Sequence, residues 1–136
     1  MKYTRNAVYT RICNAVKVDY PDANCTSRYV PKPSEFPSVY IHEIDNFRTL
    51  RGIQLDFEDV QWESAFEVQV VSNKHGTAAS EAYAIMEIVQ AAFNKLYYRQ
   101  FQQAVIDGGD KFTVIGRFRR KIGGGDTMPD NELQSV

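Results

Sequence analysis

The chain has 136 residues, of which 43% are hydrophobic and 12% aromatic, and its formal net charge is -1. One folded domain with an ordinary core fits this composition, and the near-neutral charge excludes a protein-wide basic field for nucleic acid. We expect a soluble product, made in the cytoplasm and without a membrane partner, because the chain shows no leader and no run of about 18 apolar residues. Cys13 and Cys25 lack zinc-like spacing, so we expect two reduced and mostly buried thiols.

The first predicted element is a helix over about residues 3–18. Apolar residues recur along it at helical spacing, as at Val8, Ile12 and Val16. Pro21 cannot continue the helix and therefore marks its end.

Two strands separated by a proline-rich loop are predicted next. Residues 25–30 form a short strand, and the prolines within residues 31–37 place the following loop at an edge or on the surface. Residues 38–45 alternate in the manner of a strand, with Val39 and Ile41 on one face. We expect both faces of this strand to be partly covered.

Residues 46–62 form a predicted long arm or loop. A structureless loop of about 17 residues is uncommon in compact domains unless it binds something. Ile53, Leu55 and Phe57 alternate with polar residues, which predicts an extended arm or a long hairpin that offers apolar surface to a partner. A mobile surface loop is the alternative interpretation.

A strand, a polar turn and the longest helix form the unit around which the chain is organised. Apolar and polar residues alternate from Phe66 to Val70, which predicts a half-buried strand. Residues 72–76 supply the turn. The helix over about residues 77–97 carries one apolar stripe, and Thr77 is its expected N-cap.

A final hairpin completes the domain. Residues 100–106 and 112–122 are the predicted strands, and the sequence Asp-Gly-Gly-Asp between them is a turn signal. Residues 123–136 are glycine-rich and polar, and we expect a flexible tail there. The predicted fold is therefore α+β: a single domain over residues 1–122, with both helices packed on a mainly antiparallel sheet.

The sequence contains no recognisable catalytic, cofactor or metal motif. The two histidines, His42 and His75, lie on a predicted strand and in a predicted turn. An enzyme would need a pocket that brings one of them beside a carboxylate with a shifted pKa. The acidic cluster within residues 56–63 lacks the spacing of a calcium-binding EF-hand loop and is expected to be a solvated face. We therefore predict no catalytic residue, no cofactor and no metal.

Four basic residues between positions 117 and 121 lie in the last predicted strand, and three of them share one strand face. We call these four residues the basic strip. It can contact nucleic acid phosphates, but no aromatic platform of the RNA-recognition kind accompanies it. We instead predict that it meets the acidic arm of a neighbouring copy, a head-to-tail contact that closes into a ring where the rotation fits. The candidate interface residues are Arg117, Arg119, Arg120 and Lys121 of the basic strip, and Leu55, Asp56, Phe57, Glu58 and Asp59 of the arm.

Four features occur in a fixed order over about residues 5–122. They are a short N-terminal helix, the proline-bounded strand FPSVYIHEID, the strand FEVQVVSN followed directly by the helix TAASEAYAIMEIVQAAFNKL, and a last strand pair ending near GRFRRKIG. In this order the chain resembles the tail terminator, or tail completion, proteins of long-tailed bacteriophages. The shared features are patterns of residue type and spacing.

The resemblance implies a structural virion protein without catalytic residues. It implies a ring, expected to be a hexamer, that caps the tail tube, ends its polymerisation and offers a surface for head attachment. The implied partners are further copies, the major tail tube protein and a head-completion or connector protein, while DNA only passes through the ring lumen. The implied location is the head-proximal end of the virion tail, after synthesis in the host bacterial cytoplasm. A head-closure or head-tail joining protein and a small nucleic-acid-binding module are the alternative interpretations.

Overall fold

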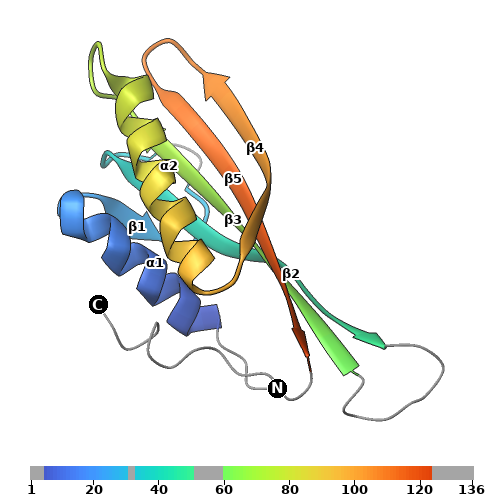
Figure 1. Cartoon of the computed structure of the whole chain (residues 1–136). Helices are drawn as coiled ribbons and strands as arrows, with labels where there is room; N and C mark the ends of the chain where they lie inside the picture. The colour runs from blue at the N-terminus through green and yellow to red at the C-terminus, as the bar shows by residue number, and fades with distance from the viewer. Residues whose placement is uncertain (1–4, 31–32, 51–59, 124–136) are drawn as a thin grey trace.

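The computed structural model describes residues 5–30, 33–50 and 60–123. They form two helices and a five-stranded sheet with the strand order β1-β2-β3-β5-β4 (Figure 1). β1 runs parallel to β2, and the other neighbouring pairs are antiparallel, so the predicted α+β class is confirmed. The elements are α1 (Arg5–Asp19), β1 (Asn24–Thr26), β2 (Ser38–Leu50), β3 (Val60–Ser72), α2 (Ala78–Lys95), β4 (Arg99–Asp107) and β5 (Phe112–Gly123).

Both helices lie on the same face of the sheet (Figure 1). Their apolar stripes bury against alternate residues of the central strands, and fully burying one such side chain contributes about 1.5–3 kcal/mol. The opposite face of the sheet carries no helix from the described part of the chain. The core includes Ile12 and Val16 of α1, Ile85, Val89 and Phe93 of α2, and Ile41, Phe66, Val68, Val70, Val114 and Phe118 of the sheet.

Aromatic side chains fix α2 against the sheet. Phe93 stacks on Phe118, with 4.4 Å between ring centroids and an interplanar angle of 12°. Nearby, Gly116 of β5 leaves room for Met86 of α2, because a Cβ atom at Gly116 would lie 2.8 Å from Sδ of Met86. Helix and sheet therefore meet at a point where a larger residue does not fit.

Two local predictions are wrong. β1 ends at Thr26 instead of near residue 30, because the Thr26 hydroxyl accepts a hydrogen bond from the backbone N–H of Arg28 and turns the chain. Thr77 does occupy the N-cap of α2, but its side chain makes no capping hydrogen bond. Glu81, in the first turn of α2, instead accepts a hydrogen bond of 2.7 Å from the hydroxyl of Ser72 in β3.

The predicted arm over residues 46–62 is wrong at both ends. β2 and β3 pair as far as Leu50 and Val60, so residues 46–50 and 60–62 belong to strands. β3 also pairs with β5 out to Gly123, and this second partner supports the extended hairpin. The alternative prediction of a long hairpin is correct for these residues, whereas residues 51–59 lie outside the described chain.

The outer boundaries agree with the prediction within a few residues. α1 begins at Arg5 where the described chain begins, and ends at Asp19. The hairpin turn lies between β4 and β5 as expected, with Gly109 at a φ of 84°. The predicted tail begins within β5, at Gly123, and residues 124–136 lie outside the described chain.

Candidate functional site

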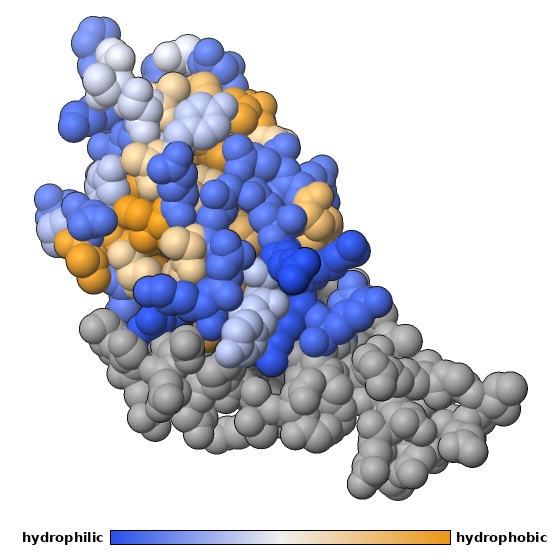
Figure 2. All heavy atoms as spheres, viewed as in Figure 1, coloured by the Kyte–Doolittle hydropathy of each residue, from blue (hydrophilic) through white to orange (hydrophobic). Residues whose placement is uncertain are grey.

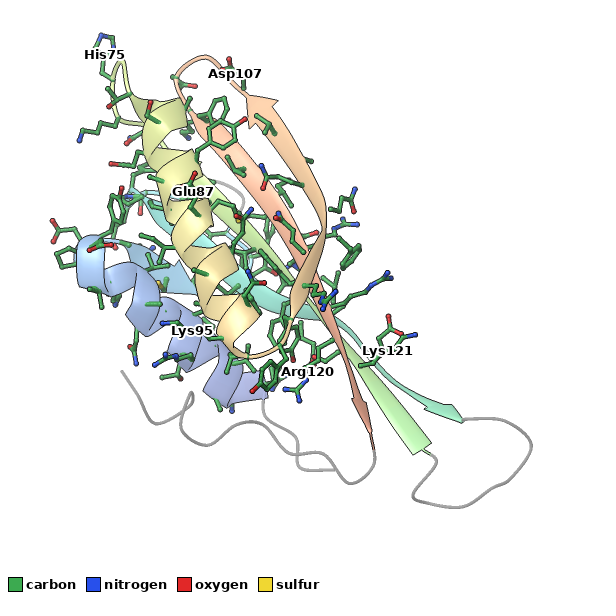
Figure 3. All side chains as sticks on the ribbon, in the orientation of Figure 1. His75, Glu87, Lys95, Asp107, Arg120 and Lys121 are labelled. Carbon is green, nitrogen blue, oxygen red and sulfur yellow. The ribbon has the colours of Figure 1, made fainter. Side chains whose placement is uncertain are left out.

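A basic hollow lies where α2 ends and β4 begins. It has a volume of about 370 Å³ and is lined by Tyr97, Arg99, Arg119, Arg120 and Lys121. None of these lining residues is acidic. Figure 3 shows Arg120 and Lys121 near the lower end of β5, at the opposite end of the sheet from Asp107 and His75. We call this feature the basic hollow.

Strand register brings the arginines of the basic hollow together. Arg99, the first residue of β4, lies directly opposite Arg119 of β5. Like charges in directly opposed cross-strand positions are destabilising. Arg99 and Lys121 form no ion pair within the described residues. The charges of Arg99 and Lys121 are therefore not compensated by an ion pair from the described residues, and an anionic partner would relieve them.

Two aromatic rings flank this charge. The guanidinium carbon of Arg119 lies 5.0 Å from the ring centroid of Phe101, and that of Arg120 lies 5.4 Å from the ring centroid of Tyr97. Arg120 also donates a hydrogen bond of 3.1 Å to the carbonyl oxygen of Leu96, the C-cap residue of α2. Arg120 thus stabilises the end of the helix, while Arg119 remains turned to solvent beside an exposed ring.

Tyr97 holds a backbone conformation that normally favours glycine. Its φ is 65°, and the N–H groups of Tyr97 and Tyr98 donate to the carbonyls of Asn94 and Phe93, both at 3.0 Å. This pair of hydrogen bonds ends the helix in a Schellman motif, in which glycine is the usual left-handed residue. Tyr97 is also 62% exposed, which makes its side chain a candidate for a binding role.

Arg117 of the predicted basic strip does not belong to the basic hollow. Its Nε atom donates to Oε2 of Glu67 at 2.8 Å, and its Nη1 atom donates to Oε1 of Gln102 at 3.1 Å. The structure therefore divides the predicted strip. Arg117 is neutralised within the sheet, and the other three residues of the strip line the basic hollow.

Glu67 is the centre of a polar network on the sheet face without helices. It is only 7% exposed, and its carboxylate also accepts hydrogen bonds from Gln69 at 2.9 Å and from Nε2 of His42 at 3.0 Å. Burial alone would raise the pKa of Glu67, but the hydrogen bonds from Gln69, His42 and Arg117 outweigh it and lower the pKa below its usual value. The ring of Tyr40 stacks on His42 with 4.3 Å between centroids.

An enzyme would need a pocket that brings a histidine beside a carboxylate with a shifted pKa, and this network meets part of that condition. His42 lines a hollow of about 390 Å³ between the start of α1 and β2, and a carboxylate with a shifted pKa lies beside it. A lowered pKa makes Glu67 a weaker base, however, and its oxygens are already held by three donors. His75 lies in the exposed turn between β3 and α2, away from this network (Figure 3). The described residues contain no cluster suited to a metal ion.

Other predicted residues have simpler outcomes. Leu55, Asp56, Phe57, Glu58 and Asp59 lie outside the described residues, so their contacts stay predictions. Both cysteines are free, with Cys13 buried and Cys25 partly buried. Neither α1 nor α2 is long and apolar enough to cross a membrane.

Sequence reasoning missed Arg99 and Tyr97. The hairpin turn sets the register of β4 and β5 near Asp107, but the register shifts between Gln100 and Gln102. Without that bulge, Arg119 would lie opposite Gln100. The sequence carries no clear signal for the bulge, so the juxtaposition of Arg99 and Arg119 emerges only from the structure.

Comparison with known proteins adds no assignment of function. No protein-family model and no curated protein matches the sequence. Among solved structures, one whose title states neither function nor organism covers 84% of this chain and 89% of its own length, with 16% identity and a TM-score of 0.46. This degree of likeness carries no argument about function.

Proposed function

We propose that this protein is a tail terminator, a subunit of a ring that caps the tube of a long phage tail. The basic hollow is the observation that supports this proposal. It gathers positive charge at one end of the sheet, and the same chain carries the acidic residues Asp56, Glu58 and Asp59 between β2 and β3. Two different and complementary patches on one chain favour head-to-tail contacts between copies.

A ring of such copies fits the role that the sequence resemblance implies. The ring would end polymerisation of the tail tube by covering its last layer, and would present its other side to a head-completion protein. The role requires no bond to be made or broken, so the chain would act without catalysis or cofactor. DNA would pass through the lumen, and the protein would reside at the head-proximal end of the tail after synthesis in the bacterial cytoplasm.

The basic hollow can be tested by charge reversal. The double variant Arg119→Glu with Lys121→Glu keeps the capping contact of Arg120 and should lower the mass of the assembly to that of the monomer in sedimentation velocity. The matched control is Lys17→Glu with Lys74→Glu, which makes the same change in net charge at exposed positions outside the basic hollow. An assembly that survives the first variant as well as the second contradicts the proposed contact.

The role itself can be tested in the parent phage or prophage. Electron microscopy of particles lacking this gene should reveal tail tubes of uncontrolled length and unattached heads. Tails of normal length beside loose heads would instead assign the protein to head closure or head-tail joining. Normal infectious particles would refute both virion roles.

A nucleic-acid-binding module is the second candidate. The observation that favours it is the pair of rings, Tyr97 and Phe101, beside the guanidinium groups of the basic hollow. Binding of this kind would be strongly salt-dependent, because phosphate contacts release counterions. Absence of single- or double-stranded DNA binding by micromolar protein in low salt would exclude it.

A further inference from the structure

Among the described residues, β4 is an edge strand whose only evident protection is the register shift between Gln100 and Gln102. It forms one border of the sheet, and its residues from 101 onward are exposed (Figure 1). Between Arg99 and Asp107 it has no charged residue, and Phe101, Val105 and Ile106 are 43%, 42% and 56% exposed. Figure 2 shows hydrophobic surface near the upper ends of β4 and β5. Soluble proteins usually guard such an edge with lysine, proline or a covering element, because it can pair with another strand.

The opposite border of the sheet is also largely open. β1 pairs only with Ser38, Val39 and Tyr40 of β2. From Ile41 to Leu50, the outer side of β2 has no partner strand in the described part of the chain. The described residues therefore leave two open edges of similar length, one on each side of the sheet.

The directions of the two edges match. β2, β3, β5 and β4 alternate in direction, so β4 runs antiparallel to β2. When two copies in the same orientation stand side by side, β4 of one copy meets β2 of the next in the antiparallel sense. A parallel pair of edges would not offer this more stable ladder.

The two edges also complement each other in charge and shape. Across the sheet, Asp45 of β2 is level with Ala65, Arg119 and Arg99 in turn. A negatively charged residue on one border of the sheet therefore lies at the same level as a positively charged residue on the other border. Each edge also carries a register shift at this level, between Glu43 and Asp45 in β2 and between Gln100 and Gln102 in β4.

We propose that β4 of one copy pairs antiparallel with the outer edge of β2, residues 41–50, of the next copy. The contact joins two different edges, so each copy offers one to each neighbour and the sheets continue around the ring. It rests on the proposed function in requiring a ring, and it names the backbone contact that holds the ring together. It also leaves no β4 edge open to unwanted pairing.

Two double variants test this pairing, and in each of them added lysines block one of the two edges. In the first, Val105→Lys with Ile106→Lys places charge on exposed positions of β4. In the second, Ile44→Lys at an exposed position is combined with Asp45→Lys, which reverses the charge beside the register shift of β2. Each full-length variant alone should sediment as a monomer of 15.6 kDa. A matched control, Val18→Lys with Ala91→Lys, adds two lysines at exposed helix positions and should assemble like the wild type.

Mixing the two variants gives the decisive result. Each retains one intact edge, so an equimolar mixture should form a one-to-one dimer of twice the monomer mass and nothing larger. A mixture that stays monomeric overturns the pairing, as does a β4 variant that still assembles alone. If the β2 variant alone forms a dimer, β4 pairs with β4 and the proposed pairing is again wrong.

The same measurements separate this inference from the proposed function. A wild-type ring that both blocked variants still form refutes the strand pairing and leaves the terminator role intact. A wild-type chain that remains monomeric in solution and on isolated tail tubes refutes both. Circular dichroism and the urea midpoint of each variant verify that the added lysines have not unfolded the chain.

Discussion

Arg99 lies directly opposite Arg119 in the antiparallel ladder between β4 and β5, and the two side chains line the same basic hollow. This arrangement is unfavourable for an isolated subunit, since like charges opposed across a ladder repel. It becomes favourable when an acidic surface closes over the hollow. In the proposed ring, the pair would therefore link the stability of the subunit to assembly.

Replacing Arg99 with Glu should stabilise the isolated subunit and weaken assembly. The substitution converts a like-charge pair into an opposite-charge pair, which contributes about 0.2–1 kcal/mol relative to neutral residues. Urea unfolding at a concentration too low for assembly should show the higher stability of the isolated subunit. Sedimentation velocity at high concentration should show the weaker assembly. Arg99→Gln is the intermediate control. A less stable Glu variant would contradict the repulsion inferred from the register.

Tyr97→Gly should be more stable than Tyr97→Ala. Both variants lose the contact between the ring and the guanidinium of Arg120, worth about 0.5–1 kcal/mol at an exposed site. Only glycine also removes the strain of a φ of 65°, which costs an L-residue about 1–2 kcal/mol. Thermal unfolding of both variants measures the difference. If Ala and Gly are equally stable, the strain argument for Tyr97 fails.

The sequence predicted the centre of the fold better than its ends. The alternation around Phe66 and the apolar stripe of α2 report burial directly, because each residue type matches its own environment. The lengths of β2 and β3 depend instead on pairing between distant segments, including β5. Local patterns carry no measure of how far such pairing extends, so the sequence leaves an arm, a long hairpin and a loop open for residues 46–50 and 60–62.

The candidate site shows the same division between features set by local patterns and features set by pairing of distant segments. Arg119 and Lys121, which the period of a strand places together, both line the basic hollow, and Arg120 between them lines it as well. The partner of Arg117 could not be foreseen. Glu67 lies fifty residues earlier in the chain, and it reaches Arg117 only because β3 and β5 are neighbours in this register.

Cys25 should react slowly with alkylating agents in the folded protein. Burial, with the neighbouring thiol of Cys13, raises the pKa of Cys25 to about 12. The reactive thiolate is then scarce at pH 8, so iodoacetamide should modify native Cys25 more than about a hundredfold more slowly than the urea-unfolded chain. Intact mass spectrometry measures the rate. A Val18→Cys variant supplies an exposed thiol for comparison, and equal rates at the two positions would contradict the burial of Cys25.

Glu67→Gln should destabilise the fold near pH 7 and have less effect in acid. The substitution replaces an anion that holds Arg117 and His42, and hydrogen bonds to charged groups contribute about 1.5–3 kcal/mol. The folded-state pKa of Glu67 is lowered, so its contribution is complete above the unfolded value of about 4.3 and is lost as pH falls through the folded value. The stability gap between wild type and variant should therefore narrow below about pH 4. Urea titrations from pH 3 to 7 on both proteins test this, and a gap independent of pH would show that Glu67 acts by shape and not by charge.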